Sequence, residues 1–405
     1  MLSVLKFALG KFITARLASP AKIHIRIRND QEEHLLETDD LKRQGDHPHF
    51  VLVIKERDIV WDILKNPDPG LGEAYMEGQW HLAQGDIGEF ITYLASGRIR
   101  IVDSPLGRIF NGLLNIARPH NYDHSPEANY ELVQHHYDIG DDLYELFLDE
   151  GMNYSCAFFE TPDQSLRDAQ LNKIRTSIKR LGVEPDMKVL DIGCGWGETT
   201  RIIAQEAGAQ AHGITLAENQ IATAHKRAKG IKPEPEYFLK DYREHASEYQ
   251  EYYDRIISIG MLEHVGDESY NEYFQAVRSQ LKPGGKALIH SIVRSGEEST
   301  AEMSSPWLDK YIFPGGCIPE IKDMIEIAQS QGLRLAHEPY IQDSFHYAET
   351  LRRWRANFLK NQDKLPLDPY DKRFRRMWIY YLAMCEAMFE GCGFRVVQNV
   401  FEKPD

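Results

Sequence analysis

The sequence has few cysteines, no excess of positive charge and no long apolar run. Its 405 residues include five cysteines, and none of them forms a C-x-x-C pair. An odd and scattered set of this kind argues against a disulfide framework or a zinc ribbon and indicates a reducing compartment. The formal net charge is −15 at pH 7, which disfavours a nucleic-acid binder held by phosphate contacts.

No segment of the sequence is long and apolar enough to cross a bilayer. The opening stretch MLSVLKFALGKFITARLASP contains an apolar run that Lys11 and Arg16 interrupt, and no basic segment precedes it. This pattern is typical of an amphipathic helix rather than of a signal peptide or a transmembrane span. We expect it to pack on its own domain or on a partner subunit, with a membrane-surface role as the alternative.

Two patterns of different kinds divide the chain. Residues 1–115 hold short alternating runs such as KIHIRIR and FVLVIKE, which indicate a small α+β domain, and a polar stretch predicts a linker at 116–130. In 131–405 the strand candidates KVLDIG, AHGITL, DRIISIG and KALIHSIV alternate with helical patterns, and RLAHEPYIQ and FRVVQNVFEK follow near the end. This alternation predicts an α/β fold with a parallel, doubly wound sheet.

Three glycines follow the first strand of this region. In KVLDIGCGWG the strand runs into Gly193, Gly195 and Gly197. Glycine tolerates a positive φ and lets a ligand approach the backbone, and such a turn lies at the sheet edge where open α/β sheets bind ligands. Tight packing of strand on helix is the alternative. With Asp191 before the first glycine, the pattern resembles the S-adenosylmethionine (SAM) turn of class I methyltransferases.

Several longer motifs occur in a fixed order and are more specific than the glycine turn. They are HHYDIGDDLYELFLDEGMNYSCAFFE, VLDIGCGWGETT, GITLAENQ, IGMLEHVG, LIHSIV, YIFPGG and HYAETLRRWR. Together they resemble the cyclopropane-fatty-acid synthase family, which includes the mycolic acid cyclopropane synthases. The likeness covers residues 125–405, and GLGEAYMEGQW extends it to the N-terminal domain of the longer bacterial synthases.

The resemblance implies a fold and a reaction. The fold is that of class I SAM-dependent methyltransferases, a Rossmann-like and mostly parallel seven-stranded sheet, with helical acyl-binding insertions and a smaller α+β N-terminal domain for lipid binding or dimerisation. The SAM methyl passes to a cis double bond of an unsaturated phospholipid acyl chain. The resulting carbocation loses a proton from the new methyl to a bound bicarbonate, and a cyclopropane ring closes. A cytoplasmic homodimer, associated with the inner face of the membrane, is the implied form.

The resemblance also carries over site residues. It implies that bicarbonate is held by Cys156, Glu263, His290, Ile292 and Tyr347, with main-chain groups from Cys156 and Ile292. The expected SAM contacts are Tyr154, Ser155, Asp191, Gly193, Gly195, Thr215, Leu216, Gln220, Asp241, Tyr242 and Ile259, with Gln220 in place of the usual acidic ribose ligand. No metal site is expected, because His135 and His136 lack further ligands at a suitable spacing.

Chemical requirements of the implied reaction point to the same residues. An alkene is a poor nucleophile, so the sulfonium methyl must be held close to it, and the cation that follows requires a dry cavity. Aromatic faces stabilise cations, and the nearby candidates are Tyr154, Phe158, Phe159, Trp307, Tyr311, Phe313 and Tyr347. Taken singly, each of them except Tyr347 is expected to be a core residue, with cavity lining as the alternative. Glu263 and His290 are the acid–base candidates. The alternative for Glu263 is a carboxylate at the start of a helix, and the alternative for His290 is a core histidine. Cys156 has no adjacent base, so covalent catalysis is not expected.

A basic and aromatic segment offers an acidic protein a way to reach a lipid. Residues 351–376 contain nine Lys or Arg against three Asp, a local charge of +6, with Trp354, Phe358 and Phe374 interleaved. Near an anionic leaflet each basic residue contributes about 1 kcal/mol. We expect this segment to dock on an anionic membrane surface, with a solvated helical face as the alternative.

Two other functions stay open at this level. A SAM-dependent acyl C-methyltransferase that makes methyl-branched or methylene chains needs the same cation and differs only in the last step. A non-catalytic lipid-binding protein with an inactive methyltransferase fold is the alternative from another class. Glu263 and the glycines that activity requires are present, which disfavours that alternative.

Overall fold

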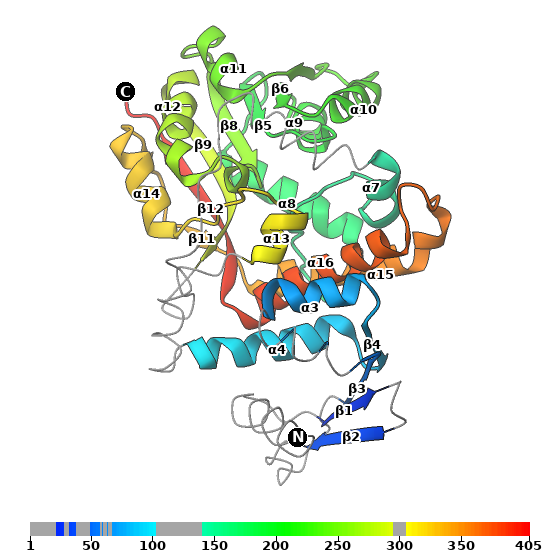
Figure 1. Ribbon diagram of the computed structural model, residues 1–405. Helices are drawn as coiled ribbons and strands as arrows, with labels where there is room; N and C mark the ends of the chain where they lie inside the picture. Colours follow the sequence, from blue (N-terminus) through cyan, green and yellow to red (C-terminus); the bar gives the residue numbers. More distant parts are fainter. Residues whose placement is uncertain are drawn as a thin grey trace. The chain divides into compact units, whose positions relative to one another are not determined.

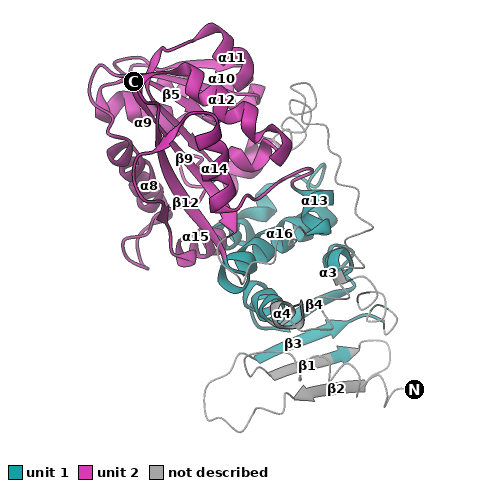
Figure 2. Ribbon diagram, turned by 90° about the vertical axis from the view of Figure 1, so that its left-hand side faces the viewer, with its two compact units in different colours: residues 1–120, 298–312, 354–393 teal, residues 121–297, 313–353, 394–405 magenta. Residues whose placement is uncertain are grey.

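The computed structural model describes residues 22–27, 32–37, 49–56, 59, 63, 67–102, 140–294 and 305–405. The chain folds into two compact units (Figure 2), which are Met1–His120 with Glu298–Ile312 and Trp354–Gly393, and Asn121–Glu297 with Phe313–Arg353 and Phe394–Asp405. The predicted N-terminal amphipathic helix, the predicted linker at 116–130, and His135 and His136 lie outside the described residues. The domain boundaries therefore stay a prediction.

The second unit is built on a central sheet with the strand order β10-β12-β9-β8-β5-β6-β7 (Figure 1). Its parallel strands are β5 (Lys188–Ile192), β6 (Gln210–Thr215), β7 (Glu236–Leu239), β8 (Tyr253–Ile259) and β9 (Leu281–Arg294). Three strands are antiparallel to their neighbours, namely β12 (Phe394–Glu402) against β9, and β10 (Arg334–Leu335) and β11 (Tyr340–Ile341) against β12. The predicted α/β class and mostly parallel sheet are confirmed. β7 was not predicted.

Helices cover both faces of this sheet. They are α7 (Asp141–Phe147), α8 (Leu166–Leu181), α9 (Glu198–Ala207), α10 (Glu218–Ala228), α11 (Tyr242–Glu248), α12 (Tyr270–Gln280), α14 (Ile321–Ser330) and the short helices η1 (Leu262–His264) and η2 (Asp267–Ser269). Leu190 of β5 packs in one core cluster with α11, α12 and α14, whereas Val189 packs in another with α8 and α9. Since successive strand residues alternate between faces, Asp191 lies on the α8 side with Val189. By the same rule His290 shares that side with Leu288 of β9.

Helix α8 is well defined at both ends. Ser165 Oγ accepts a hydrogen bond from Asp168 N at 3.1 Å, and Gly182 ends the helix at φ 64°. These are the side-chain N-cap and the left-handed C-cap that helices favour. The buried face of α8 includes polar residues, among them Gln170, Lys173 and Ser177, which are at most 1% exposed. A rigid helix thus presents polar groups to the sheet face that carries Asp191 and His290.

The first unit combines a four-stranded sheet of order β2-β1-β3-β4 with helices from distant parts of the chain. Its elements are β1 (Lys22–Ile27), β2 (Glu32–Glu37), β3 (His49–Ile54), α3 (Pro67–Met76), β4 (Trp80–Gln84), α4 (Ile87–Val102), α13 (Pro306–Tyr311), η3 (Gln362–Lys364) and α16 (Lys372–Gly391). α15 (Ser344–Asn361) has residues in both units. Tyr75 of α3 contacts Trp80 at 4.8 Å and Tyr380 of α16 at 5.8 Å between ring centroids. The predicted α+β character is confirmed.

Arg355 is the centre of a buried ion cluster in the first unit. Its Nη1 and Nη2 donate to the two carboxylate oxygens of Asp86 at 2.6 and 2.8 Å. Nη2 also donates to Glu386 Oε2 at 2.8 Å. The side chains of Arg355 and Glu386 are only 4% and 1% exposed, so this pair is removed from water.

The basic segment at 351–376 is less available to a membrane than its composition predicts. Its arginines pair with carboxylates, in the pairs Arg352–Glu349, Arg353–Glu349, Arg355–Asp86, Arg355–Glu386, Arg373–Glu77 and Arg375–Asp363. Arg376 donates to the backbone oxygens of Tyr75 and Trp80. The prediction of interleaved surface aromatics is wrong for Trp354 and Phe358, which are fully buried. No helix in the described part of the chain has the length and apolarity to span a membrane.

Candidate active site

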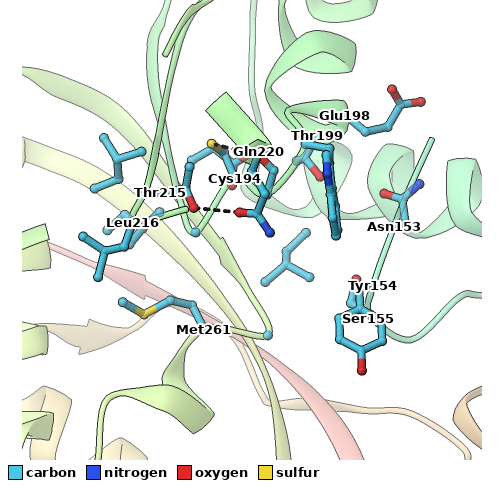
Figure 3. Close-up of a pocket in the computed structure, with 18 of the residues that line it drawn as sticks. Asn153, Tyr154, Ser155, Cys194, Glu198, Thr199, Thr215, Leu216, Gln220 and Met261 are labelled. Atoms are coloured by element: carbon cyan, nitrogen blue, oxygen red, sulfur yellow. Dashed lines mark hydrogen bonds between the residues drawn. The ribbon is translucent and has the colours of Figure 1, made fainter. Parts of the chain in front are cut away.

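A cavity lies where β5, β6 and β8 end, at the carboxyl edge of the sheet (Figure 3). All the residues predicted to contact SAM line it, namely Tyr154, Ser155, Asp191, Gly193, Gly195, Thr215, Leu216, Gln220, Asp241, Tyr242 and Ile259. Tyr154 and Ser155 lie across the cavity from Thr215 and Leu216 in Figure 3. The structure therefore brings these residues together from five separate segments, and their role in binding stays a prediction.

The three glycines of the turn all have a positive φ, 81° at Gly193, 54° at Gly195 and 81° at Gly197. A side chain at Gly197 would place its Cβ 2.7 Å from Ala224 Cβ, so tight packing requires this glycine. A Cβ at Gly195 would meet no protein atom within 4 Å, although the residue lines the cavity. Tight packing therefore accounts for Gly197, whereas approach of a ligand to the backbone at Gly195 stays a prediction.

Polar groups around the cavity are held in place by short hydrogen bonds. Asp191 Oδ2 accepts from Thr200 Oγ1 at 2.7 Å, and burial raises the pKa of Asp191 to about 6. Thr215 Oγ1 donates to Gln220 Oε1 at 2.8 Å, which is the bond drawn in Figure 3. The buried hydroxyl of Tyr242 has no hydrogen-bond partner among the described residues. Because buried polar groups are normally satisfied, this hydroxyl is suited to a polar ligand.

Glu263 is fixed against strand β9 by one of its two carboxylate oxygens. It follows β8 in η1, and its Oε1 accepts from Ile292 N at 2.6 Å. The other oxygen, Oε2, is buried and has no hydrogen-bond partner among the described residues. Burial raises the pKa of Glu263 to about 7, although the Ile292 hydrogen bond opposes this shift. One oxygen thus orients the side chain while the other is left to act on a ligand.

His290 is held as a neutral imidazole with a defined tautomer. Burial lowers its pKa to about 3, and the charges of Lys173 and Arg180 add to this. Gln398 Nε2 lies 3.2 Å from His290 Nδ1, while Gln398 Oε1 accepts from Arg180 Nη1. Since the amide Nε2 is a donor, Nδ1 accepts and the proton of the ring resides on Nε2. The ring of Phe158 stacks on His290 at 6.0 Å.

The three remaining predicted catalytic residues are Cys156, Ile292 and Tyr347. Cys156 is buried, its Sγ donates to Ala157 O at 3.3 Å, and burial raises the pKa of the thiol. A thiol held protonated is a poor nucleophile. Ile292 has both main-chain groups engaged, since its N donates to Glu263 and its O accepts from Ser291 Oγ. Tyr347 is half-buried on α15, the helix that the Cys156 loop reaches through Ala157 N to Thr350 Oγ1 at 3.0 Å.

The predicted aromatic candidates divide between the two units. Tyr154 lines the cavity, and Phe313 lies 5.9 Å from the ring of His264, another cavity residue. Trp307 and Tyr311 belong to the first unit, where the ring of Trp307 lies 4.9 Å from that of Tyr380 and 5.4 Å from that of Tyr311. For Trp307, which is 1% exposed, core packing within its unit is the better description.

Sequence reasoning missed two polar residues of this site, Lys173 and Gln398. Lys173 lines the cavity from α8, and Gln398 of β12 orients His290. The sequence signals Gln398 as a polar residue within the apolar strand pattern FRVVQNVFE, whereas Lys173 lies in the mostly polar helical segment QLNKIRTSI. This signal is weak, because a long polar side chain at such a position is usually exposed at its tip.

A family model described as mycolic acid cyclopropane synthetase matches residues 124–399, more than half of the chain. The chain belongs to this family. The predicted recognition is confirmed, and so is the predicted enzyme class of SAM-dependent methyltransferase. Within the family, the cyclopropane-fatty-acyl-phospholipid synthase of Escherichia coli K12 is 34% identical over 351 residues, 86% of this chain and 87% of the relative.

Three further likenesses bear on the reaction and the fold. The tuberculostearic acid methyltransferase UfaA1 of Mycobacterium tuberculosis is 37% identical over 336 residues, 80% of this chain and 76% of the relative. The solved mycolic acid cyclopropane synthase CmaA1, complexed with SAH and CTAB, superposes with a TM-score of 0.61 at 31% identity, over 68% of this chain and 98% of that one. The cyclopropane synthase MmaA2 from Mycobacterium tuberculosis gives 0.62 at the same identity and coverage.

Replacing Gly195 by alanine is expected to weaken SAM binding by about tenfold or more, because the new methyl group enters the space that the ligand needs. Gly230→Ala is the matched control, since Gly230 has a φ of 84° and also meets no atom within 4 Å, yet does not line the cavity. Both variants carry the same backbone strain of about 1–2 kcal/mol. Isothermal titration should show the loss for Gly195→Ala alone, and an equal loss in both would contradict the ligand contact.

Proposed function

We propose that the protein is a cyclopropane-fatty-acyl-phospholipid synthase. It transfers the SAM methyl to a cis double bond of an unsaturated phospholipid acyl chain, and loss of a proton from that methyl closes the ring. The observation that carries the proposal is the carboxylate of Glu263, which lies two residues beyond the cavity-lining Met261 with one oxygen anchored and one unpartnered. A methyl transfer that ends in proton loss needs such an acid–base group beside the donor site.

The groups around Glu263 fit a small anion that carries a hydroxyl. Oε2 of Glu263 is an unused acceptor, and Nε2–H of His290 is a donor. We therefore propose that Cys156, Glu263, His290, Ile292 and Tyr347 hold bicarbonate, which supplies the base when bound. Because Ile292 N already donates to Glu263, its part in this set is to orient the carboxylate.

Electrostatics around these residues suit a developing carbocation. His290 is neutral, so it adds no positive charge where the cation forms. The stacked face of Phe158 presents π-electrons, which attract a cation. Cys156 and Phe158 are at most 7% exposed, so water that would trap the cation is kept away.

Phospholipid as the substrate is supported by the E. coli relative, whose name specifies a fatty-acyl-phospholipid. We also propose that the protein associates with an anionic membrane surface. The proposed contact is a smaller patch of the first unit, not the whole basic segment. Its exposed side chains include Leu359, Lys360, Lys364, Leu367 and Lys372, with Asp363, Asp368 and Asp371 exposed among them. Cations beside apolar tips favour anionic leaflets. A cytoplasmic location and a homodimer are proposed on the family resemblance alone.

An acyl C-methyltransferase is the second candidate, because UfaA1 is named a tuberculostearic acid methyltransferase and is 37% identical to the chain over 336 residues. It would use the same cavity and lose a different proton. Incubation with SAM and vesicles of monounsaturated phosphatidylglycerol, followed by mass spectrometry of the fatty acids, distinguishes the two. A product heavier by one CH₂ that resists hydrogenation supports the synthase. A heavier product that takes up hydrogen supports the methyltransferase, and an unchanged lipid would overturn both.

A further inference from the structure

Lys173 is a buried lysine in the wall of the cavity. It lies on α8, is 1% exposed and lines the cavity beside Ser155 and Asp191. Its Nζ donates to Ser155 Oγ at 2.8 Å. In the described part of the chain no carboxylate lies within ion-pair distance of this ammonium group.

Apart from Lys173 and Asp191, the charged side chains of the cavity have partners of opposite charge. Lys240 pairs with Glu248 at 2.5 Å. The carboxylate of Asp241 accepts from the guanidinium of Arg243 at 2.8 and 3.0 Å. Glu198 is paired with two arginines, Arg167 and Arg201. Lys173 and Asp191 are the charged groups of this wall whose ion-pair partners are not supplied by the described residues.

An ammonium group has three donors, and Lys173 uses one of them on a neutral hydroxyl. Burying a charge without a counter-ion is costly, and burial lowers the pKa of Lys173 to about 8. A ligand that brings a carboxylate into the cavity would complete the hydrogen bonding of Lys173. It would also restore the preference of this lysine for the charged form.

We propose that Lys173 binds the carboxylate at the methionine end of SAM, together with the hydroxyl of Ser155. The proposal rests on the proposed function only in taking SAM as the ligand of the cavity. Asp191, on the same wall, is matched to the ammonium group of that end. Lys173 thus binds the carboxylate and Asp191 binds the ammonium group of the methionine end. Because both ends of this group are fixed, the direction in which the sulfonium methyl points is also fixed.

Decarboxylated SAM provides the test, because it lacks only the carboxylate. We expect isothermal titration to show that Lys173→Met weakens binding of SAM by about 10- to 100-fold, the range of a charge-assisted hydrogen bond. Binding of decarboxylated SAM should change by less than about twofold. Lys240→Met is the comparison variant, since this cavity lysine already has a carboxylate partner, and it should affect both ligands equally.

The outcomes distinguish a ligand-binding role of Lys173 from a structural role, and both from a protein that does not bind SAM. Equal losses of both ligands in Lys173→Met, with thermal unfolding unchanged, would make Lys173 a structural residue and overturn the proposal. Unchanged binding of SAM would overturn it as well. If the unmodified protein binds neither ligand, the proposed function fails before Lys173 is considered. Should Lys173→Met fail to fold, Lys173→Gln with the same two ligands decides.

Discussion

Glu263→Gln is expected to lower the rate of product formation by about 10²- to 10⁴-fold, the usual contribution of a positioned acid–base group. Glutamine keeps an oxygen that can accept from Ile292 N, so the loop remains in place. It replaces the unpartnered Oε2 by a group that can no longer accept a proton or a hydrogen bond in the same way. Rates are measured with labelled SAM and monounsaturated phospholipid vesicles.

The control for this variant is Glu268→Gln, an exposed carboxylate in η2 a few residues further along the chain. It should leave the rate within about twofold, as expected for a surface position. SAM affinity should be unchanged in both variants, because Glu263 does not line the cavity. If Glu263→Gln kept more than about a tenth of the rate, the acid–base role would be wrong.

The pKa of Glu263 also predicts the stability of this variant. The pKa is raised from 4.5 to about 7 in the folded state, so the folded protein binds the proton more tightly than the unfolded chain. Folding stability is therefore lost as the pH rises from 4.5 to 7, and the cost of about 3 kcal/mol is complete above pH 7. Glu263→Gln should be more stable than the unmodified protein at pH 8 and equally stable at pH 4.5. Thermal unfolding at the two pH values checks this.

Arg355→Met is expected to reduce the free energy of unfolding by about 3–5 kcal/mol, the cost of leaving one partner of a buried ion pair uncompensated. Glu386 would keep its charge in a site where its side chain is 1% exposed. Asp86 would lose the guanidinium that donates to both of its oxygens. Chemical denaturation followed by circular dichroism measures the change.

Arg373→Met is the matched control, because its pair with Glu77 is about half exposed on both sides. Exposed pairs contribute about 0–1 kcal/mol. Adding Glu386→Gln to Arg355→Met should restore part of the lost stability, since it removes the stranded charge. Equal effects of Arg355→Met and Arg373→Met would show that the buried cluster does not stabilise the first unit.

Strand positions were predictable where the pattern was long and apolar. KVLDIG, DRIISIG and KALIHSIV became β5, β8 and β9, because a strand covered on both faces is apolar throughout. β7 was missed since EYFL is only four residues long and only its Tyr237 is buried. Local pattern cannot distinguish such an edge strand from a loop.

The cavity residues were predictable from motifs, whereas Lys173 and the fate of the basic segment were not. Lys173 depends on the face of α8 that meets the sheet, which only the packed structure defines. The charge of 351–376 was counted along the chain, but Asp86, Glu77 and Glu386 come from other segments. Long-range ion pairs cancel charges that a linear count leaves free.

The most direct test follows the hydrogens of the transferred methyl. The protein is incubated with SAM deuterated on its methyl group and with monounsaturated phospholipid, and the fatty acids are analysed by mass spectrometry. Ring closure by proton loss from the new methyl predicts a product without a double bond that retains two of the three deuterons. A product that keeps all three deuterons together with a double bond would contradict ring closure and place the lost proton on the acyl chain.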